Sequence, residues 1–399
     1  HEDEVERRLL TMAIATRVLD LHLLSWNGLV KCRVSPGAEK AEVVGSQLEG
    51  ENMRSVCQDP FNPRRLYAAS VTDTYLSEDG GDSWKWLPAG GVDYREIWTM
   101  SADPSRPSVV YVGTLPAMVY RSENGGRSFE ELSSFRDIPS FGKWTFPPAP
   151  HAPNIRCIAL DARVPDEILV GVEEGGVMRS RDNGATWEDI SGPWTDEAFP
   201  KVNDPAGIQP YEPGKIIDGR VYRDVHWVVR DPSNLDRIYA ATGFGAFRTE
   251  DGGNWWTRLD YGMERGYAVP MAVHPEKPNR LFLGAGFYGP TSWKGAKAAR
   301  TGPFTASRWS LDRFAETGGA LSEVLRSDDF GETWRKLAGG LPSANPYMIS
   351  GVDINPMDPD MVFVTYTDGS LYESDDAGES WRLILSGVER LFGVKVAAA

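Results

Sequence analysis

Six copies of one eight-residue pattern constrain the fold of this 399-residue chain more than any other feature. Each copy has Ser or Thr at position 1, Asp or Asn at position 3, Gly at position 5 and Trp or Phe at position 8. The copies occupy residues 77–84, 122–129, 180–187, 249–256, 327–334 and 374–381. A signature that returns every few tens of residues predicts a repeat architecture.

The residue types of this pattern are those of a turn. The acidic or amide side chain can accept hydrogen bonds from backbone N–H groups of its own turn. The Gly supplies a backbone conformation with positive φ, and the final aromatic side chain is large enough to fill space between neighbouring sheets. The pattern therefore predicts a hairpin turn between two antiparallel strands, rather than six acid groups in six active sites.

A second repeat precedes each pattern. It consists of a polar residue and usually Pro, followed by a β-rich triplet such as Leu66-Tyr-Ala or Val362-Phe-Val. The polar residues are Asp59, Asp103, Asp161, Asp231, His274 and Asn355. One unit thus contains strand, Pro turn, strand, variable loop, strand, patterned turn and strand. Four antiparallel strands repeated around an axis form a β-propeller blade.

The two ends of the chain supply one further blade. Residues 16–24, 27–33 and 41–44 read as three strands, and residues 390–396 begin a unit that the sequence does not finish. We therefore predict an all-β fold: a single seven-bladed β-propeller with six patterned turns, whose last blade is closed by N- and C-terminal strands. Closure removes an exposed sheet edge. Six blades with a loose N-terminal arm is the alternative.

The pattern resembles the bacterial neuraminidase repeat, or Asp-box, of the sialidase-like β-propellers. That superfamily includes sialidases, xyloglucan-active glycosidases, sortilin-type receptor domains and photosystem II assembly factor propellers. The resemblance extends over nearly the whole chain and implies the propeller fold. It says little about function, because the group contains both hydrolases and binding proteins.

Composition narrows the classes of partner. The formal net charge of −15 disfavours a nucleic-acid partner or an anionic membrane surface, and no segment is apolar enough to insert into a membrane. The three cysteines, Cys32, Cys57 and Cys157, fall on predicted strands and read as buried free thiols, which favours a cytoplasmic location. We interpret residues 1–11 as an N-terminal extension or leader and residues 12–399 as the propeller.

The long insertions indicate the functional face. Patterned turns and Pro turns lie on one face, which we call the box face. The loops between blades, and those between the second and third strands of a blade, lie on the opposite top face. Insertions at 133–153, 191–223 and 286–322 all belong to the top face and are rich in aromatic residues, among them Phe135 and Trp144. Long aromatic loops favour a functional role, and we expect them to form the rim of a funnel.

Charged and aromatic residues cluster where inner strands begin. These are Arg54, Arg95, Arg156, Arg223, Arg265, Arg390, Trp98, Tyr347, His226 and Tyr267. Guanidinium groups bind carboxylate, sulfate or phosphate and stay charged when partly buried. The prediction is a ligand-binding funnel for an anionic small molecule or glycan. Two alternatives stay open: a protein-docking surface, and pairing of each Arg with a neighbouring acid. The acids considered are Asp93, Glu96, Asp224, Asp218, Glu264 and Glu389.

Whether the protein is an enzyme stays uncertain. The resemblance to sialidases implies an arginine triad, a Tyr nucleophile helped by Glu, and an Asp acid/base. Tyr267, Glu264 and the acid/base candidate His226 form our catalytic set; Tyr347, Glu96, Asp93 and Asp137 are the other residues of suitable type. The Arg-Ile-Pro segment of sialidases is absent, and the xyloglucan-active relatives use two propellers, whereas this sequence holds one. A glycoside hydrolase or lyase other than a true sialidase is the alternative to a binding protein.

No metal or cofactor is expected from the sequence. The five histidines show no HxH or HExxH spacing, and there is no CxxC pair. His274 takes the place of Asp in a Pro turn and reads as structural. His226 and His151 could meet at the top face, as ligands or as an acid/base pair, although a lone inner-strand His is more often a core residue.

Overall fold

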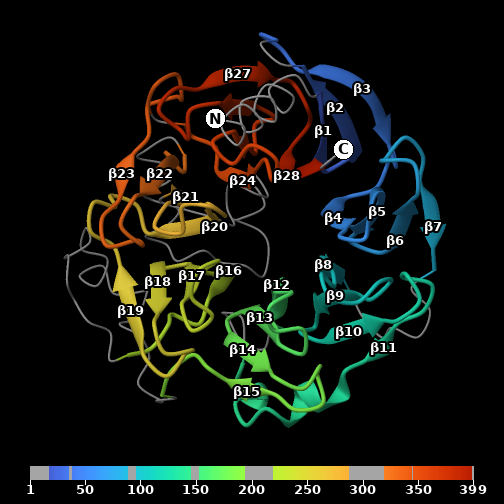
Figure 1. Cartoon of the computed structure of the whole chain (residues 1–399), viewed down its shortest axis with the longest axis vertical. Coiled ribbons are helices and arrows are strands. Elements are labelled where there is room, and N and C mark those ends of the chain that lie inside the picture. Colours follow the sequence, from blue (N-terminus) through green and yellow to red (C-terminus); the bar gives the residue numbers. More distant parts are fainter. Residues whose placement is uncertain are drawn as a thin grey trace, which may run out of the picture.

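Seven four-stranded antiparallel sheets surround a central axis in this protein (Figure 1). The structure, a computed structural model, describes residues 18–35, 38–88, 96–144, 152–193, 219–286, 319–343 and 345–397. Within these ranges the only helices are two short 3₁₀ segments, η1 (Ser133–Asp137) and η2 (Phe141–Lys143). Neither is long and apolar enough to cross a membrane. The prediction of an all-β seven-bladed propeller is confirmed.

Each blade runs from an inner strand at the axis to an outer strand at the rim (Figure 1). The inner strands are β4 (Met53–Asp59), β8 (Glu96–Ala102), β12 (Asn154–Leu160), β16 (Val225–Arg230), β20 (Tyr267–Val273), β24 (Ile349–Ile354) and β28 (Leu391–Ala397). The second strands are β5 (Asn62–Ser70), β9 (Val110–Leu115), β13 (Ile168–Glu173), β17 (Ile238–Thr242), β21 (Leu281–Gly286), β25 (Val362–Tyr366) and β1 (Leu19–Ser25).

The remaining strands complete the blades in the same order. The third strands are β6 (Thr74–Ser77), β10 (Val119–Ser122), β14 (Gly176–Ser180), β18 (Gly245–Thr249), β22 (Glu323–Ser327), β26 (Leu371–Ser374) and β2 (Gly28–Val34). The outer strands are β7 (Lys85–Leu87), β11 (Glu130–Glu131), β15 (Glu188–Asp189), β19 (Trp256–Leu259), β23 (Arg335–Lys336), β27 (Arg382–Leu385) and β3 (Glu42–Gln47).

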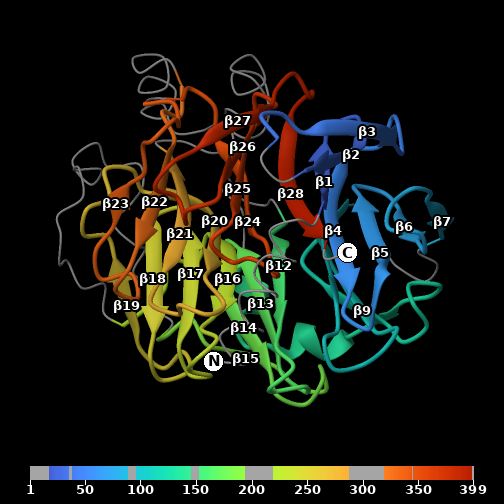
Figure 2. The same ribbon diagram turned by 45° about the horizontal axis from the view of Figure 1, so that its top comes forward.

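The two ends of the described chain meet in one blade. Strand β28 pairs antiparallel with β1, with Val396 opposite Leu21 and Val394 opposite Leu23; Figure 2 shows the red C-terminal strand beside the blue N-terminal one. All four residues are buried. This pairing excludes the six-blade alternative, since the N-terminal strands belong to the ring.

The patterned turns are Asp-boxes held by their own side chains. In the fifth copy, Asp329 Oδ1 accepts hydrogen bonds from Ser327 Oγ (2.7 Å) and Thr333 N (2.9 Å), and Asp329 Oδ2 accepts one from Thr333 Oγ1 (2.6 Å). Gly331 N donates to Ser327 Oγ (2.8 Å), and Gly331 has a φ of 88°. Because Asn124 replaces Asp in the second copy, its amide donates to Ser128 Oγ (2.8 Å) instead of accepting.

The aromatic residue that ends each box packs between blades, as predicted. Trp256 and Trp334 are almost fully buried. Trp256 Nε1 donates to the backbone oxygen of Ile190 (2.7 Å), and Trp334 Nε1 donates to that of Leu259 (3.2 Å). Both acceptors belong to the preceding blade. The box therefore connects a tight turn in one blade to the packing against the preceding blade.

The Pro turns use a second set of side-chain acceptors. Asp231 Oδ1 accepts hydrogen bonds from Ser233 N (2.6 Å) and Asn234 N (3.1 Å). At the equivalent place His274 Nδ1 accepts from the backbone N–H groups of residues 276 (3.2 Å) and 277 (3.0 Å). An imidazole nitrogen thus replaces a carboxylate oxygen as the hydrogen-bond acceptor. This geometry agrees with a structural role for His274.

The described part of the first insertion is core rather than rim. Phe135 is fully buried and its ring meets that of Trp187 edge-on at 4.9 Å; Trp144 is 6% exposed. The expectation that these two aromatics line a funnel was wrong, because they fill the space beside an Asp-box. Phe141, also expected at the rim, is partly buried, and its ring centre lies 5.0 Å from that of Trp144. The remaining aromatic residues expected at the rim lie outside the described residues: Phe146, Trp194, Phe199, Tyr211, Phe287, Tyr288, Trp293, Phe304, Trp309 and Phe314.

Replacing the box carboxylate should destabilise the propeller. Asp329→Ala removes two acceptor oxygens and the three hydrogen bonds that they accept, and is expected to lower the free energy of unfolding by about 1–3 kcal/mol at pH 7. Asp329→Asn is the matched control: it should lose less than half as much, because the second box folds with Asn124. Equal losses for the two variants in urea unfolding would contradict this account of the box.

The same pair of variants tests the charge of the box. Burial opposes ionisation of Asp329, but hydrogen bonds from Thr333 and Ser327 outweigh it and lower the pKa of the carboxyl. A carboxyl with a lowered folded-state pKa stabilises the protein fully above its unfolded pKa of about 3.9. That stabilisation is lost as the pH falls through the folded value, so the gap between wild type and Asp329→Asn should narrow in acid.

Candidate functional site

Every inner strand contains a β-bulge near its top-face end. The pairing register with the second strand skips Arg54 in β4, Trp98 in β8, Arg156 in β12, His226 in β16, Val269 and Pro270 in β20, Ser350 in β24 and Phe392 in β28. A bulge redirects the side chain of the extra residue. Because it occurs in all seven blades, it presents one ring of side chains at the top of the axis.

Four of these side chains stack across consecutive blades. The guanidinium carbon of Arg54 lies 5.3 Å from the ring centre of Phe392 and 4.4 Å from that of Trp98. The guanidinium of Arg156 lies 5.0 Å from the same Trp98 ring. Cation–π contact with an indole stabilises an arginine when water is partly excluded. The sequence predicted all three of Arg54, Trp98 and Arg156, and the structure brings them together.

Arg54 is a largely buried cation, its side chain 14% exposed, with a weak counter-charge. Its ion-pair partner Glu96 is 4.0 Å away, and in the described part of the chain its Nε has no hydrogen-bond partner. Burial is the main cause that lowers the pKa of Arg54 to about 10; the charge of Arg156 lowers it further, and Glu96 opposes. The guanidinium is still protonated at neutral pH. It is therefore positioned to accept an anion.

His226 lies beside Tyr267 on the next blade. The imidazole is fully buried, its ring centre is 4.6 Å from that of Tyr267, and Nδ1 donates to the Ala268 backbone oxygen (2.8 Å). Nε2 lies 3.1 Å from Asp224 Oδ1. Burial lowers the pKa of His226, but the Asp224 carboxylate outweighs burial and raises it. Two members of the predicted catalytic set, His226 and Tyr267, are therefore in contact.

Two acids, Glu173 and Asp224, lie beside His226, and a third, Glu174, interacts with both of them; our sequence reasoning gave Glu173 and Glu174 no role. Glu173 ends β13 and Glu174 follows it in the hairpin to β14, while Asp224 precedes β16. Burial, followed by the charges of Asp224 and Glu173, raises the pKa of Glu174 well above its ordinary value. A protonated carboxyl beside an ionised one can serve as acid and base. The signal in the sequence was the Glu-Glu pair at a top-face hairpin.

The other predicted residues take different positions. Arg223 Nη1 donates to Asp189 Oδ2 (2.9 Å) and to the Gly175 backbone oxygen (2.7 Å), which binds it to the preceding blade. Arg265 forms ion pairs with Glu323 and Glu264. Arg390 lies over the ring of Trp26 (5.4 Å). Glu264 and Tyr347 are exposed to solvent, while Arg95 and His151 lie outside the described residues.

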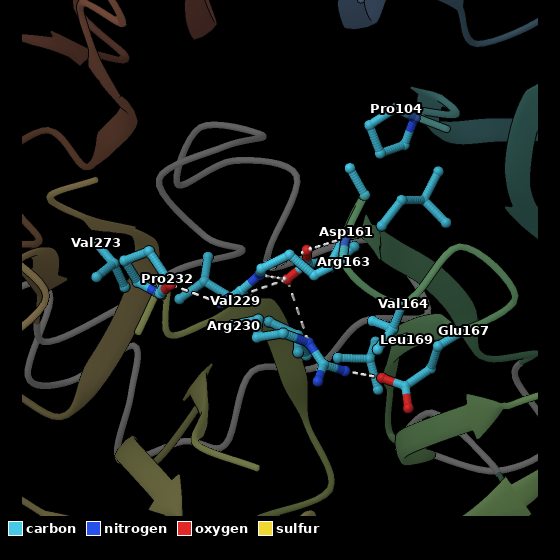
Figure 3. Close-up of a pocket in the computed structure, with 14 residues that line it drawn as sticks. Pro104, Asp161, Arg163, Val164, Glu167, Leu169, Val229, Arg230, Pro232 and Val273 are labelled. Atoms are coloured by element: carbon cyan, nitrogen blue, oxygen red, sulfur yellow. Dashed lines mark hydrogen bonds and ion pairs between the residues drawn. The ribbon is translucent and has the colours of Figure 1, made fainter. Parts of the chain in front are cut away.

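A separate pocket of about 570 Å³ opens at the other end of the inner strands. It lies on the box face, and Figure 3 shows its charged side chains turned toward one another. Arg230 pairs with Glu167, and Arg163 Nε donates to Asp161 Oδ1 (2.9 Å). The charges of this pocket neutralise each other, and its walls are Val and Leu side chains. At the top-face ring, by contrast, Arg54 Nε has no hydrogen-bond partner among the described residues.

No family model matches the chain. Among curated proteins it is similar to the oligoxyloglucan-reducing end-specific xyloglucanase of Emericella nidulans, with 23% identity over 305 residues, which is 71% of this chain and 34% of the relative. A probable enzyme of the same description from Neosartorya fischeri is 24% identical over 318 residues, 73% of this chain and 35% of the relative. The chain thus spans about a third of the length of these relatives.

Solved structures confirm the fold. The GH74 xyloglucanase from Xanthomonas campestris superimposes with a TM-score of 0.58 and 17% identity, covering 92% of this chain and 47% of that one. YCF48 from Cyanidioschyzon merolae gives a TM-score of 0.53 and 14% identity, covering 85% and 87%. YCF48 bound to D1 peptide gives 0.50 and 16%, covering 84% and 82%. The fold is that of the Asp-box propellers that the sequence pattern resembles.

Neutralising two arginines of the predicted set should change the free energy of unfolding by different amounts. Arg223→Met leaves the half-buried Asp189 carboxylate without its cation and is expected to lower the free energy of unfolding by about 2–4 kcal/mol. Arg54→Met should change it by less than about 1 kcal/mol, because Glu96 is distant and a Met side chain keeps the contacts with Trp98 and Phe392. Urea unfolding measures both. A greater loss for Arg54→Met would refute the assignment of Arg54 as a ligand group.

Proposed function

We propose that this propeller binds a carboxylate-bearing ligand at the top-face end of its axis. The observation that carries the proposal is Arg54, a largely buried cation whose counter-ion is 4.0 Å away and whose Nε has no hydrogen-bond partner among the described residues. Guanidinium groups bind carboxylates with two parallel hydrogen bonds. A ligand carboxylate would supply the acceptor that Arg54 lacks.

The surrounding charges favour a singly charged anion. Glu173 lies 3.7 Å from Arg156, and Glu174 and Asp224 are close to Glu173. A phosphate or other dianion would be repelled by these acids more strongly than a carboxylate would, because Coulomb repulsion scales with charge. We therefore prefer a carboxylate group over phosphate.

The comparisons suggest two classes of ligand, a peptide and an oligosaccharide; because xyloglucan itself is neutral, an oligosaccharide would have to contain uronic acid to supply such a carboxylate. One YCF48 structure of similar length was solved bound to a peptide, and the curated relatives are named for action on xyloglucan oligosaccharides. An acidic peptide segment and an oligosaccharide containing uronic acid share the same chemistry at Arg54. The two sources are separated by experiment.

A second candidate function, glycoside hydrolysis, is favoured by the acids around His226. Glycosidases use one protonated and one ionised carboxyl group. The raised pKa of Glu174 makes it the candidate for the protonated member of such a pair. In this alternative Glu174 acts as the general acid. Glu264, which the sequence suggested, is 76% exposed and paired with Arg265.

Calorimetric titration with trigalacturonate and with a Glu-rich hexapeptide tests the binding proposal. We expect one of the two to bind wild type, and Arg54→Met to weaken that binding about tenfold or more, since a charge-assisted contact contributes at least about 1.4 kcal/mol. Arg163→Met, in the box-face pocket, is the matched control and should bind as wild type does.

The same samples distinguish binding from turnover. Release of reducing ends from trigalacturonate or xyloglucan oligosaccharides, abolished by Glu174→Gln, would establish the hydrolase. Binding without release would establish a binding protein. Equal affinity of Arg54→Met and wild type would overturn the site itself.

A further inference from the structure

Three potential metal ligands converge beside the axial ring from two segments of the chain, which belong to neighbouring blades. They are Glu173 at the end of β13, Asp224 before β16 and His226 within β16. One carboxylate oxygen of each acid and one imidazole nitrogen all lie within 4.8 Å of one another. Glu173 and His226 are buried and Asp224 is partly buried. This set is therefore unlike an exposed acidic patch, in which the carboxylates are solvated.

The imidazole is oriented as a ligand. Because the Ala268 carbonyl can only accept, Nδ1 carries the proton of that 2.8 Å hydrogen bond. Backbone carbonyls commonly fix metal-binding histidines in this way, and Nε2 is then the ring nitrogen that faces the acids. His226 is 0% exposed, and its Nε2 lies 3.1 Å from Asp224 Oδ1; within the described ranges neither atom has any other hydrogen-bond partner. Two buried acceptors that face each other require a proton or a cation between them.

We infer that Glu173, Asp224 and His226 bind one divalent transition-metal cation, for which Zn²⁺ is the best match. Two carboxylate oxygens and one imidazole nitrogen are a donor set that Zn²⁺ accepts, whereas Ca²⁺ and Mg²⁺ prefer oxygen ligands alone. The carboxylates also supply the negative charge that a dication requires. The inference goes beyond the proposed anion binding and does not depend on it.

The neighbouring residues hold the acids in place. Asn154 Nδ2 donates to Glu173 Oε2 (2.9 Å). Asp224 packs directly on the backbone of Gly243, where an added Cβ would lie 2.0 Å from Asp224 Oδ2. Only Gly at 243 leaves room for the carboxylate to face His226. Contacts of this kind orient metal ligands and are part of a metal site.

The separation of the ligand atoms fits a cation after a small adjustment. Ligand atoms about 2.0–2.2 Å from a tetrahedral Zn²⁺ are roughly 3.4 Å apart. The three ligand atoms lie within 4.8 Å of one another, and rotation of the two carboxylates can bring them to that spacing. Three protein ligands leave one position for water or for another oxygen ligand, as in open zinc sites.

Direct metal binding tests the inference without any organic ligand. The chain is stripped with a chelator, dialysed and titrated with ZnCl₂, with MnCl₂, CaCl₂ and MgCl₂ as comparisons. We expect one Zn²⁺ per chain and a rise in melting temperature with Zn²⁺ concentration. Glu173→Gln and Asp224→Asn keep the shape of the acids and should each weaken Zn²⁺ binding by roughly tenfold or more.

Two further variants keep the result interpretable. His274→Gln, on the box face, is the matched control and should bind Zn²⁺ as wild type does. His226→Gln should abolish tight binding; if it unfolds, the two isosteric acid variants decide the question. Absence of Zn²⁺ binding by wild type, or undiminished binding by both acid variants, would overturn the metal site and leave a proton between His226 and Asp224. Neither result would alter the Arg54 titrations, so the two proposals fail separately.

Discussion

The fold depends on closing a ring of sheets, none of which can bury both of its faces alone. Each blade packs its apolar faces against two neighbours, and clusters of buried residues lie between blades, as with Phe282 and Val364 or Leu21 and Phe363. The ring is complete only because β28 pairs with β1. Closure removes the free sheet edges and gives all seven inner strands the same direction relative to the axis. The site follows from that shared direction.

The bulges place chemically different side chains at equivalent positions of this symmetric ring. A regular inner strand would point alternate side chains toward the neighbouring blades, but the extra residue at each bulge does not follow that alternation. The seven positions are alike in backbone and different in side chain, so one geometry presents cations, aromatic rings and an imidazole together. Cations and stacked rings occupy the blades from β28 to β12, whereas acids surround His226 between β12 and β16. The two halves suit an anion and a cation respectively.

Much of the fold could be predicted from the sequence because the residue types of the turns identify them. The Asp-boxes placed the strands, and the four strands predicted for the terminal blade fall within a few residues of β1, β2, β3 and β28. Less of the site could be predicted from the sequence. Arg54, Trp98 and Arg156 were found by their position, but Arg223 lies just before its strand and is bound to Asp189 instead. Bulges leave no mark in residue type, and the grouping of Glu173 with Asp224 depends on contacts between blades.

The central claim is that the inner-strand bulges form one binding site at the top of the axis, with Arg54, whose Nε has no hydrogen-bond partner among the described residues, as its cation. A crystal structure grown with the carboxylate ligand that binds in solution tests it most directly. The account predicts a ligand carboxylate within hydrogen-bond distance of the Arg54 guanidinium, beside Trp98. A ligand seated instead in the box-face pocket with Arg163, or a protein carboxylate bonded to Arg54 Nε, would contradict it.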